Sequence, residues 1–122
     1  LVHGSDGTDE ITITGPTAVV KLEDDMVSTS EIHPEDAKLQ VHPLEEILGD
    51  TPDKNSKAFV DLLDGKKGAY RDSVLLNSAA ALVVSEKSSD LITGVEIAKE
   101  AIDSGKAKSA LTTLTKITTG LK

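Results

Sequence analysis

The hydrophobic pattern of the chain changes its period near Gly49, and this change restricts the fold more than any other feature. Before it, apolar and polar residues alternate in short runs bounded by Gly and Pro, a pattern typical of β-strands. After it, apolar residues recur at helical spacing. Strands followed by helices favour part of an α/β domain in which helices cover a sheet. We therefore expect a strand-rich segment over residues 1–49 and a helical segment over residues 50–122.

Three runs of the first segment are predicted to be strands, at residues 10–14, 17–22 and 27–32. Gly15-Pro16 ends the first run, and residues 23–26 are expected to form a hairpin turn between the other two. Short helical turns are expected at 33–36 and 44–48. The chain opens on Leu1-Val2, and we expect this apolar pair to belong to a buried strand that is cut from preceding sequence.

Four helices are expected in the second segment, over residues 52–64, 71–85, 90–104 and 107–117. Thr51 is a suitable N-cap for the first, and Pro52 suits its first position because the amide that proline lacks has no helical partner there. The second helix is apolar around most of its circumference, so we expect it at the centre of the domain. Asp90 suits the start of the third helix, and Gly105 its end.

Composition limits the class of partner. The chain has no cysteine, which excludes disulfides and thiolate metal sites. Its net charge is −8, whereas nucleic acids and anionic membranes attract basic surfaces. No apolar run approaches the roughly 18–20 residues that span a bilayer. We therefore expect no nucleic-acid partner, no membrane partner and a cytoplasmic location.

Two stretches carry a family resemblance. They are VHGSDGTDEITITGPT at residues 2–17 and GAYRDSVLLNSAAAL at residues 68–82, the latter followed by EAIDSGKA at 100–107. Together, and in this order, they resemble the C-terminal part of the anthranilate phosphoribosyltransferase family. The resemblance covers essentially the whole chain, and the two motifs at their separation make it fairly specific.

The resemblance implies an α/β fold like that of the type III nucleoside phosphorylases (glycosyltransferase family 3). Such proteins have a large domain with a mixed sheet and helices packed on it, beside a small helical domain that forms a homodimer. Residues 1–122 would be the C-terminal portion of the large domain. The N-terminal helical domain and the glycine-rich pyrophosphate loop would lie in absent upstream sequence.

The resemblance also implies a reaction. Members of the family transfer the phosphoribosyl group of phosphoribosyl pyrophosphate to anthranilate, with Mg²⁺ and with release of pyrophosphate, in tryptophan biosynthesis. Because the substrate-binding segments would lie upstream, we expect the 122-residue chain alone to be inactive. We assign no catalytic residue and no organic-cofactor site within it.

Asp9 and Glu10 are the candidate metal ligands. An adjacent acidic pair is, on its own, most often a solvated turn. The resemblance, however, implies that this pair holds Mg²⁺ against the diphosphate of the substrate. The chemistry fits, because Mg²⁺ is usually bound through one or two carboxylates plus phosphate oxygens. A metal ion there would stabilise the charge on departing pyrophosphate. Asp6 could be taken for a third ligand, but Ser5-Asp6-Gly7 is better interpreted as a tight turn.

The histidines favour structural interpretations. His3 is expected to be a hydrogen-bonded structural residue near the site, with a positioning role as the alternative. His33 and His42 each precede a proline in polar surroundings and are predicted to be surface residues. Scattered histidines without cysteine do not favour zinc.

Charged and polar residues at the start of the 71–85 helix also favour structural roles. Residues 65–68 (GKKG) suggest a phosphate loop but lack the Walker spacing, so a connection between helices is the better interpretation. Arg71 and Asp72 are expected to pair with other charges or to cap the helix. Asn77 requires a buried hydrogen-bond partner if it faces the core.

Two other functions remain open. One is a same-fold homologue with a nucleic-acid-binding or other non-biosynthetic role, which the strong acidity disfavours and a salt-dependent DNA titration would test. The other is a non-catalytic interaction module, which would unfold cooperatively as a monomer without exposed sheet edges.

Overall fold

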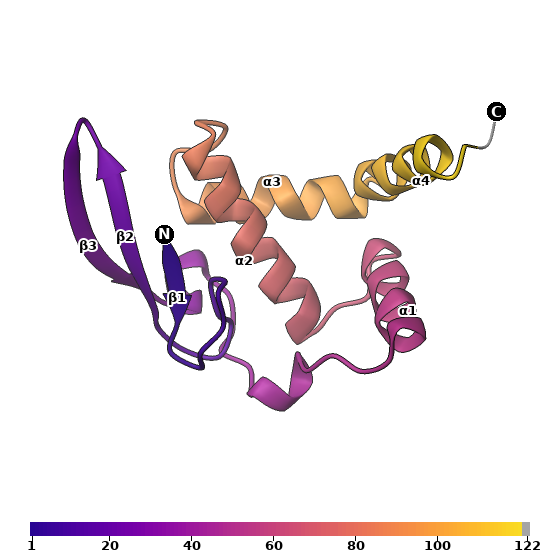
Figure 1. Ribbon diagram of the computed structural model, residues 1–122, viewed down its shortest axis with the longest axis horizontal. Helices are drawn as coiled ribbons and strands as arrows, with labels where there is room; N and C mark the ends of the chain where they lie inside the picture. Colours follow the sequence, from indigo (N-terminus) through magenta and orange to yellow (C-terminus); the bar gives the residue numbers. More distant parts are fainter. Residues whose placement is uncertain (121–122) are drawn as a thin grey trace.

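The computed structural model describes residues 1–120 and places a small sheet beside four helices (Figure 1). The strands are β1 (Val2–Gly4), β2 (Thr17–Glu23) and β3 (Met26–Ile32), followed by the 3₁₀ turns η1 (Pro34–Ala37) and η2 (Leu44–Glu46). The helices are α1 (Pro52–Leu63), α2 (Ala69–Val84), α3 (Leu91–Asp103) and α4 (Lys106–Thr118). Among the described residues, no helix combines the length and apolar character that crossing a membrane requires.

The sheet has the order β1-β2-β3 and is antiparallel in both pairings. β2 and β3 pair from Thr17↔Ile32 to Glu23↔Met26, so the predicted hairpin is confirmed. Its two-residue turn consists of Asp24 and Asp25, both with positive φ (49° and 61°), as a turn that matches the twist of a hairpin requires. The mixed sheet implied by the resemblance was expected for the whole large domain, and the described strands of residues 1–120 pair only antiparallel.

Residues 10–14 do not form the predicted strand. Ile11, Thr12 and Ile13 are all buried, so the alternation of apolar and polar residues does not correspond to two faces. Their backbone groups bond to side chains and to one distant amide instead of to a neighbouring strand. Thr12 N donates to the hydroxyl of Thr17 (3.0 Å), and Ile13 O accepts from His42 N (3.0 Å). The segment therefore reaches the core as an irregular loop.

The predicted starts of α1 and α3 are confirmed, whereas α2 begins at Ala69, two residues before the predicted start. Thr51 occupies the N-cap position of α1 in an extended conformation but makes no side-chain capping hydrogen bond, and Pro52 occupies the first turn. Asp90 caps α3, since its carboxylate accepts a hydrogen bond from Thr93 N at 2.8 Å. Gly105, at φ 77°, lies between α3 and α4 in the left-handed conformation that favours glycine.

Helix α2 occupies the centre of the molecule, as its apolar sequence predicts (Figure 1). Every residue from 71 to 80 is buried or half-buried. The core joins the buried loop to α1, α2 and α3, and its apolar members are Ile11, Ile13, Ala37, Leu62, Leu63, Leu75, Leu76, Ala79, Val95, Ala98 and Ile102.

Helices α2 and α3 are in close contact at Gly94 and Ala79. A Cβ atom added at Gly94 would lie 2.8 Å from both Cα and Cβ of Ala79, so glycine is what allows the two helices to approach so closely. At the other end of this contact, the guanidinium of Arg71 donates to the carboxylate of Asp103 at 2.6 Å. Sequence reasoning expected Arg71 to pair with a charge, and the structure identifies Asp103 as the partner.

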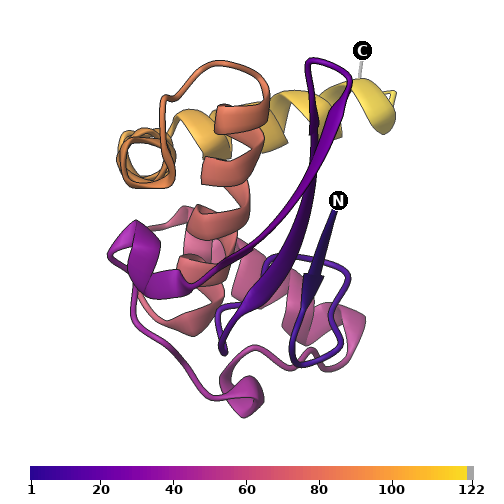
Figure 2. The same ribbon diagram turned by 90° about the vertical axis from the view of Figure 1, so that its left-hand side faces the viewer.

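The sheet contacts the helices mainly through the buried loop, with Val2 and Ile32 packed against the core. In Figure 2 the sheet stands in front of α2, and its long hairpin extends along the height of the molecule. Helix α4 carries the expected apolar stripe but no buried residue, and Leu114 and Ile117 are 57% and 74% exposed. The periodicity thus predicted the helix correctly but not its burial.

Candidate functional site

The loop that carries the candidate ligands runs from β1 to β2. It closes on itself, because Gly4 N donates to Thr8 O (2.9 Å) and Gly7 N to Gly4 O (3.0 Å). Ser5 N donates to Pro16 O (3.0 Å), which joins the two ends of the loop. A side chain at Gly4 would collide with Thr8 Oγ1 at 2.5 Å, so the tight closure depends on glycine at this position.

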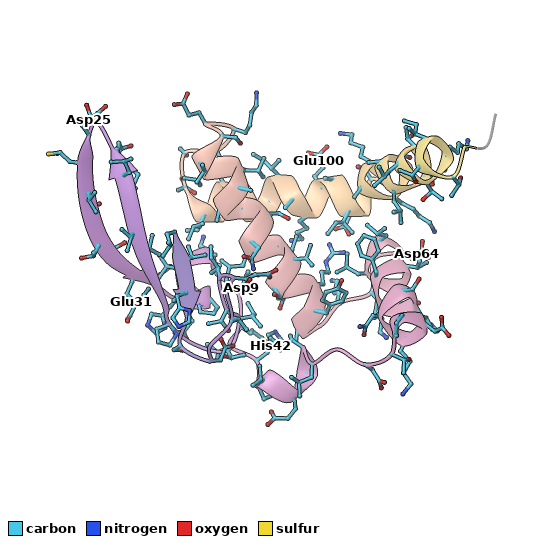
Figure 3. The ribbon with its side chains drawn as sticks, in the orientation of Figure 1. Asp9, Asp25, Glu31, His42, Asp64 and Glu100 are labelled. Atoms are coloured by element: carbon cyan, nitrogen blue, oxygen red, sulfur yellow. The ribbon has the colours of Figure 1, made fainter. Side chains whose placement is uncertain are left out.

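Asp9 and Glu10 lie at the end of this turn, and both are exposed. Figure 3 shows Asp9 in the loop between the sheet and α2. No group of three or more His, Cys, Asp or Glu side chains within residues 1–120 is arranged to hold a metal ion. The pair can therefore offer two hard oxygen donors, and further ligands would have to come from a substrate or from water.

Asp6 is held inside the loop and is not available as a third ligand. Its Oδ1 accepts hydrogen bonds from Thr8 N (3.1 Å) and Thr8 Oγ1 (2.9 Å). Its Oδ2 accepts from Thr12 Oγ1 (2.5 Å) and Thr14 Oγ1 (2.9 Å). Burial alone would raise the pKa of Asp6, but these hydrogen bonds outweigh burial and lower the pKa to about 2. The predicted role of Asp6 in the turn is confirmed. Its carboxylate also accepts hydrogen bonds from Thr12 and Thr14, which lie beyond the turn.

Asn77 of α2 anchors the same loop from the helix side. Its Nδ2 donates to Ile11 O (2.8 Å), and Ile11 N donates to its Oδ1 (3.1 Å). Nδ2 also donates to Ser73 O (3.1 Å) within the helix. This is the partner that Asn77 was expected to need. The sequence could not show that the partner is the residue directly after Glu10.

The histidines differ in part from expectation. His42 was predicted to lie on the surface, but its side chain is only 13% exposed. Its Nε2 is 2.9 Å from a carboxylate oxygen of Asp72, which connects the loop before η2 to the first turn of α2. His33, near Glu31 at 3.3 Å, is largely a surface residue as predicted. His3 is exposed on β1, and its side chain makes no hydrogen bond within residues 1–120, so the hydrogen-bonded structural role that we expected is not supported.

Residues 65–68 form a connection between α1 and α2, as predicted. Gly65 and Gly68 have φ angles of 91° and 134°, which allow the chain to reverse between the helices. Open hollows beside this connection are lined by Lys67, Gly68 and Arg71, whereas neither Asp9 nor Glu10 lines them. The acidic pair and this basic region are therefore separate features.

Comparison with known proteins defines the class. Residues 1–108 match the family described as "Glycosyl transferase family, a/b domain", and the chain belongs to this family. The match includes both motifs and the loop that carries Asp9 and Glu10. The α/β class expected from the sequence is thereby confirmed.

The similar proteins are anthranilate phosphoribosyltransferases. The enzyme of Parvibaculum lavamentivorans is 50% identical over 98% of this chain, which covers 35% of that relative. A variant of the Saccharomyces cerevisiae enzyme with Mg bound superimposes with a TM-score of 0.82 at 27% identity, over 90% of this chain and 32% of that one. The yeast enzyme in complex with PRPP and Mg gives 0.78 at 26% identity, over 90% and 31%. The chain thus spans about a third of the length of these proteins, and the resemblance stated from the two motifs is confirmed.

Proposed function

We propose that this chain forms the C-terminal third of a cytoplasmic anthranilate phosphoribosyltransferase. The observation that carries the proposal is the 50% identity to such an enzyme across nearly the whole chain. In the complete enzyme, preceding sequence would supply the helical domain, the dimer interface and the residues that bind phosphoribosyl pyrophosphate and anthranilate. Residues 1–122 would be the C-terminal portion of the catalytic α/β domain.

Within that enzyme, Asp9 and Glu10 would be the residues of this chain that hold Mg²⁺. Their exposure leaves the carboxylate oxygens accessible to a ligand. Two carboxylates without a third protein ligand suit Mg²⁺, which keeps waters and takes phosphate oxygens from its substrate. When bound, the ion supplies electrostatic stabilisation of the pyrophosphate leaving group. The loop residues supply the fixed geometry, because Asp6 and Asn77 bond it on either side of the pair.

The acidity of the chain supports a metal-bound rather than a nucleic-acid-bound role. A net charge of −8 opposes binding to a polyanion unless basic residues are concentrated on one surface. Phosphoribosyl pyrophosphate is also an anion, so its diphosphate would be repelled by the acidic pair. A divalent cation bound between the two would replace this repulsion by attraction. The metal is therefore central to the proposal.

The decisive experiment replaces Asp9 by asparagine in the complete enzyme. Transfer is followed by the loss of anthranilate fluorescence with phosphoribosyl pyrophosphate and varied Mg²⁺. We expect kcat/KM to fall at least about tenfold, since the stabilisation by a metal ion is worth several kcal/mol and tenfold corresponds to about 1.4 kcal/mol. The concentration of Mg²⁺ that gives half the maximal rate should rise.

Asp25→Asn is the matched control. It makes the same chemical change at the tip of the hairpin, which Figure 3 shows away from Asp9, and it should leave the rate unchanged. An Asp9→Asn enzyme that keeps both the wild-type kcat/KM and the wild-type half-maximal Mg²⁺ concentration would show that Asp9 is not a metal ligand. A complete enzyme without any phosphoribosyl transfer to anthranilate would refute the proposed reaction itself.

A further inference from the structure

Asp6 connects the residues on both sides of the acidic pair. Thr8, directly before the pair, donates two hydrogen bonds to one carboxylate oxygen of Asp6. Thr12 and Thr14, which follow the pair, each donate one to the other oxygen. One ionised side chain therefore links the chain entering and leaving the segment 9–10. A carboxylate offers about four lone-pair positions, and here four donors use them.

The threonines also bond one another, so the cluster resists distortion. Thr14 N donates to Thr12 Oγ1 at 3.0 Å, and the two hydroxyls lie 3.0 Å apart with their protons directed to Asp6. Thr12 is 2% exposed, and its own amide is bonded to buried Thr17 of β2. The loop is thus joined to the sheet through Thr12 and to α2 through Asn77, which holds Ile11.

We infer that Asp6 is a positioning residue, which sets the geometry of Asp9 and Glu10 for the metal without touching it. This inference rests on the proposed function. A site of this kind works only if its ligands are held within about 0.5 Å of the required geometry. Partners that orient metal ligands typically change metal affinity by about 10–100-fold when removed. The metal pair has only two protein carboxylates, so it depends strongly on how the loop presents them.

The competing explanation is that Asp6 stabilises only the fold. Asp90 provides the matched comparison, since its carboxylate also accepts a backbone amide (Thr93, 2.8 Å) and a hydroxyl (Ser89, 2.8 Å). Asp90 caps α3 and has no bond to the 5–16 loop. A carboxylate with a purely structural role should therefore behave like Asp90 when it is removed.

The experiment compares Asp6→Ala, Asp6→Asn and Asp90→Ala in the complete enzyme. We measure the Mg²⁺ concentration for half-maximal rate, KM for anthranilate, Tm, and protein-bound Mn²⁺ after equilibrium dialysis with phosphoribosyl pyrophosphate. For Asp6→Ala we expect a rise of about 10–100-fold in the Mg²⁺ requirement and weaker Mn²⁺ binding, with KM for anthranilate little changed. Excess Mg²⁺ should restore part of the rate. Asp6→Asn, which keeps one carbonyl oxygen as acceptor, should lie between Asp6→Ala and the wild type. Asp90→Ala should lower Tm alone.

The inference is overturned if Asp6→Ala lowers Tm but keeps the Mg²⁺ and Mn²⁺ dependence of the wild type, as Asp90→Ala does. If Asp6→Ala does not fold, Thr14→Val removes a single hydroxyl bond to Asp6 in a similar volume. It should raise the Mg²⁺ requirement by a smaller factor, and an unchanged requirement would overturn the inference. A wild-type enzyme that binds Mn²⁺ but does not transfer to anthranilate would refute the proposed reaction and leave the positioning role measurable by dialysis.

Discussion

Replacing Gly94 by alanine is expected to destabilise the chain, although the same change stabilises an isolated helix. The added Cβ would lie 2.8 Å from Cα and Cβ of Ala79 and 3.0 Å from Ala79 O. Carbon atoms pack best at about 3.5–4.0 Å, so α2 and α3 would have to move apart by up to about 1 Å. The atoms in the way belong to the backbone and to a Cβ, and no rotamer change can relieve the collision.

Two opposing effects set the magnitude. Alanine in place of glycine within a helix contributes about 1 kcal/mol in favour of folding. Overpacking a well-packed contact costs about 1–3 kcal/mol, and here it would also loosen Val95 and Ala98, both buried on the same side of α3. We expect a net loss of up to about 2 kcal/mol in the free energy of unfolding.

The assay is urea unfolding of the chain followed by circular dichroism at 222 nm. The double variant Gly94→Ala with Ala79→Gly provides the control, because it removes Cβ, one of the three Ala79 atoms in the collision. Alanine at 94 should then be less harmful, with a coupling energy of about 0.5–3 kcal/mol. A higher urea midpoint for Gly94→Ala, or strict additivity in the double variant, would refute the reasoning.

Two further predictions concern the hairpin and Asp6. Changing Asp24-Asp25 to Asn-Gly should raise the free energy of unfolding by about 0.5–1 kcal/mol in urea titrations, because both residues have positive φ; a lower midpoint would contradict this. The pKa of Asp6 is lowered from 3.8 to about 2, so its stabilising contribution is complete above its unfolded value and is lost as the pH falls through about 2. Between about pH 4 and pH 2, the wild type should therefore lose on the order of 1–2 kcal/mol more than Asp6→Asn in the same titration, and parallel pH profiles would exclude this role.

The sequence predicted correctly those elements that depend on interactions between residues close together in the chain. The turn residues at 24–25, the N-cap Asp90 and the 3.6-residue spacing each involve interactions within a few residues, and the structure agrees with them. Thr51 takes the N-cap position of α1 without a side-chain capping bond. The α4 stripe shows the limit of periodicity. It predicts an amphipathic helix but not whether the described chain buries its apolar face, and Ile117 remains exposed.

The architecture of the site depends on contacts that no local pattern specifies. Asn77 bonds Ile11 across 66 positions of sequence, and His42 bonds Asp72 across 30. Each residue type was compatible with a surface role, and only the fold brings the partners together. Asp6 was predicted as part of a turn from Ser5-Asp6-Gly7. Its bonds to Thr12 and Thr14 arise because the chain after Glu10 returns to the turn.

The failure of the predicted strand at 10–14 bears directly on the metal proposal. In a β-strand successive side chains point to opposite faces, so a strand that began near Glu10 would direct neighbouring carboxylates apart. The backbone N–H groups of this segment instead donate to the side chains of Asn77 and Thr17, so they need no hydrogen bonds to a neighbouring strand. Because side chains satisfy the backbone, the buried segment 11–13 need not be a strand. Asp9 and Glu10, directly before it, can therefore both be exposed instead of pointing to opposite faces of a sheet. The same threonines that suggested β-structure from sequence serve here as hydroxyl donors to Asp6, and their chemistry matters more than their β-propensity.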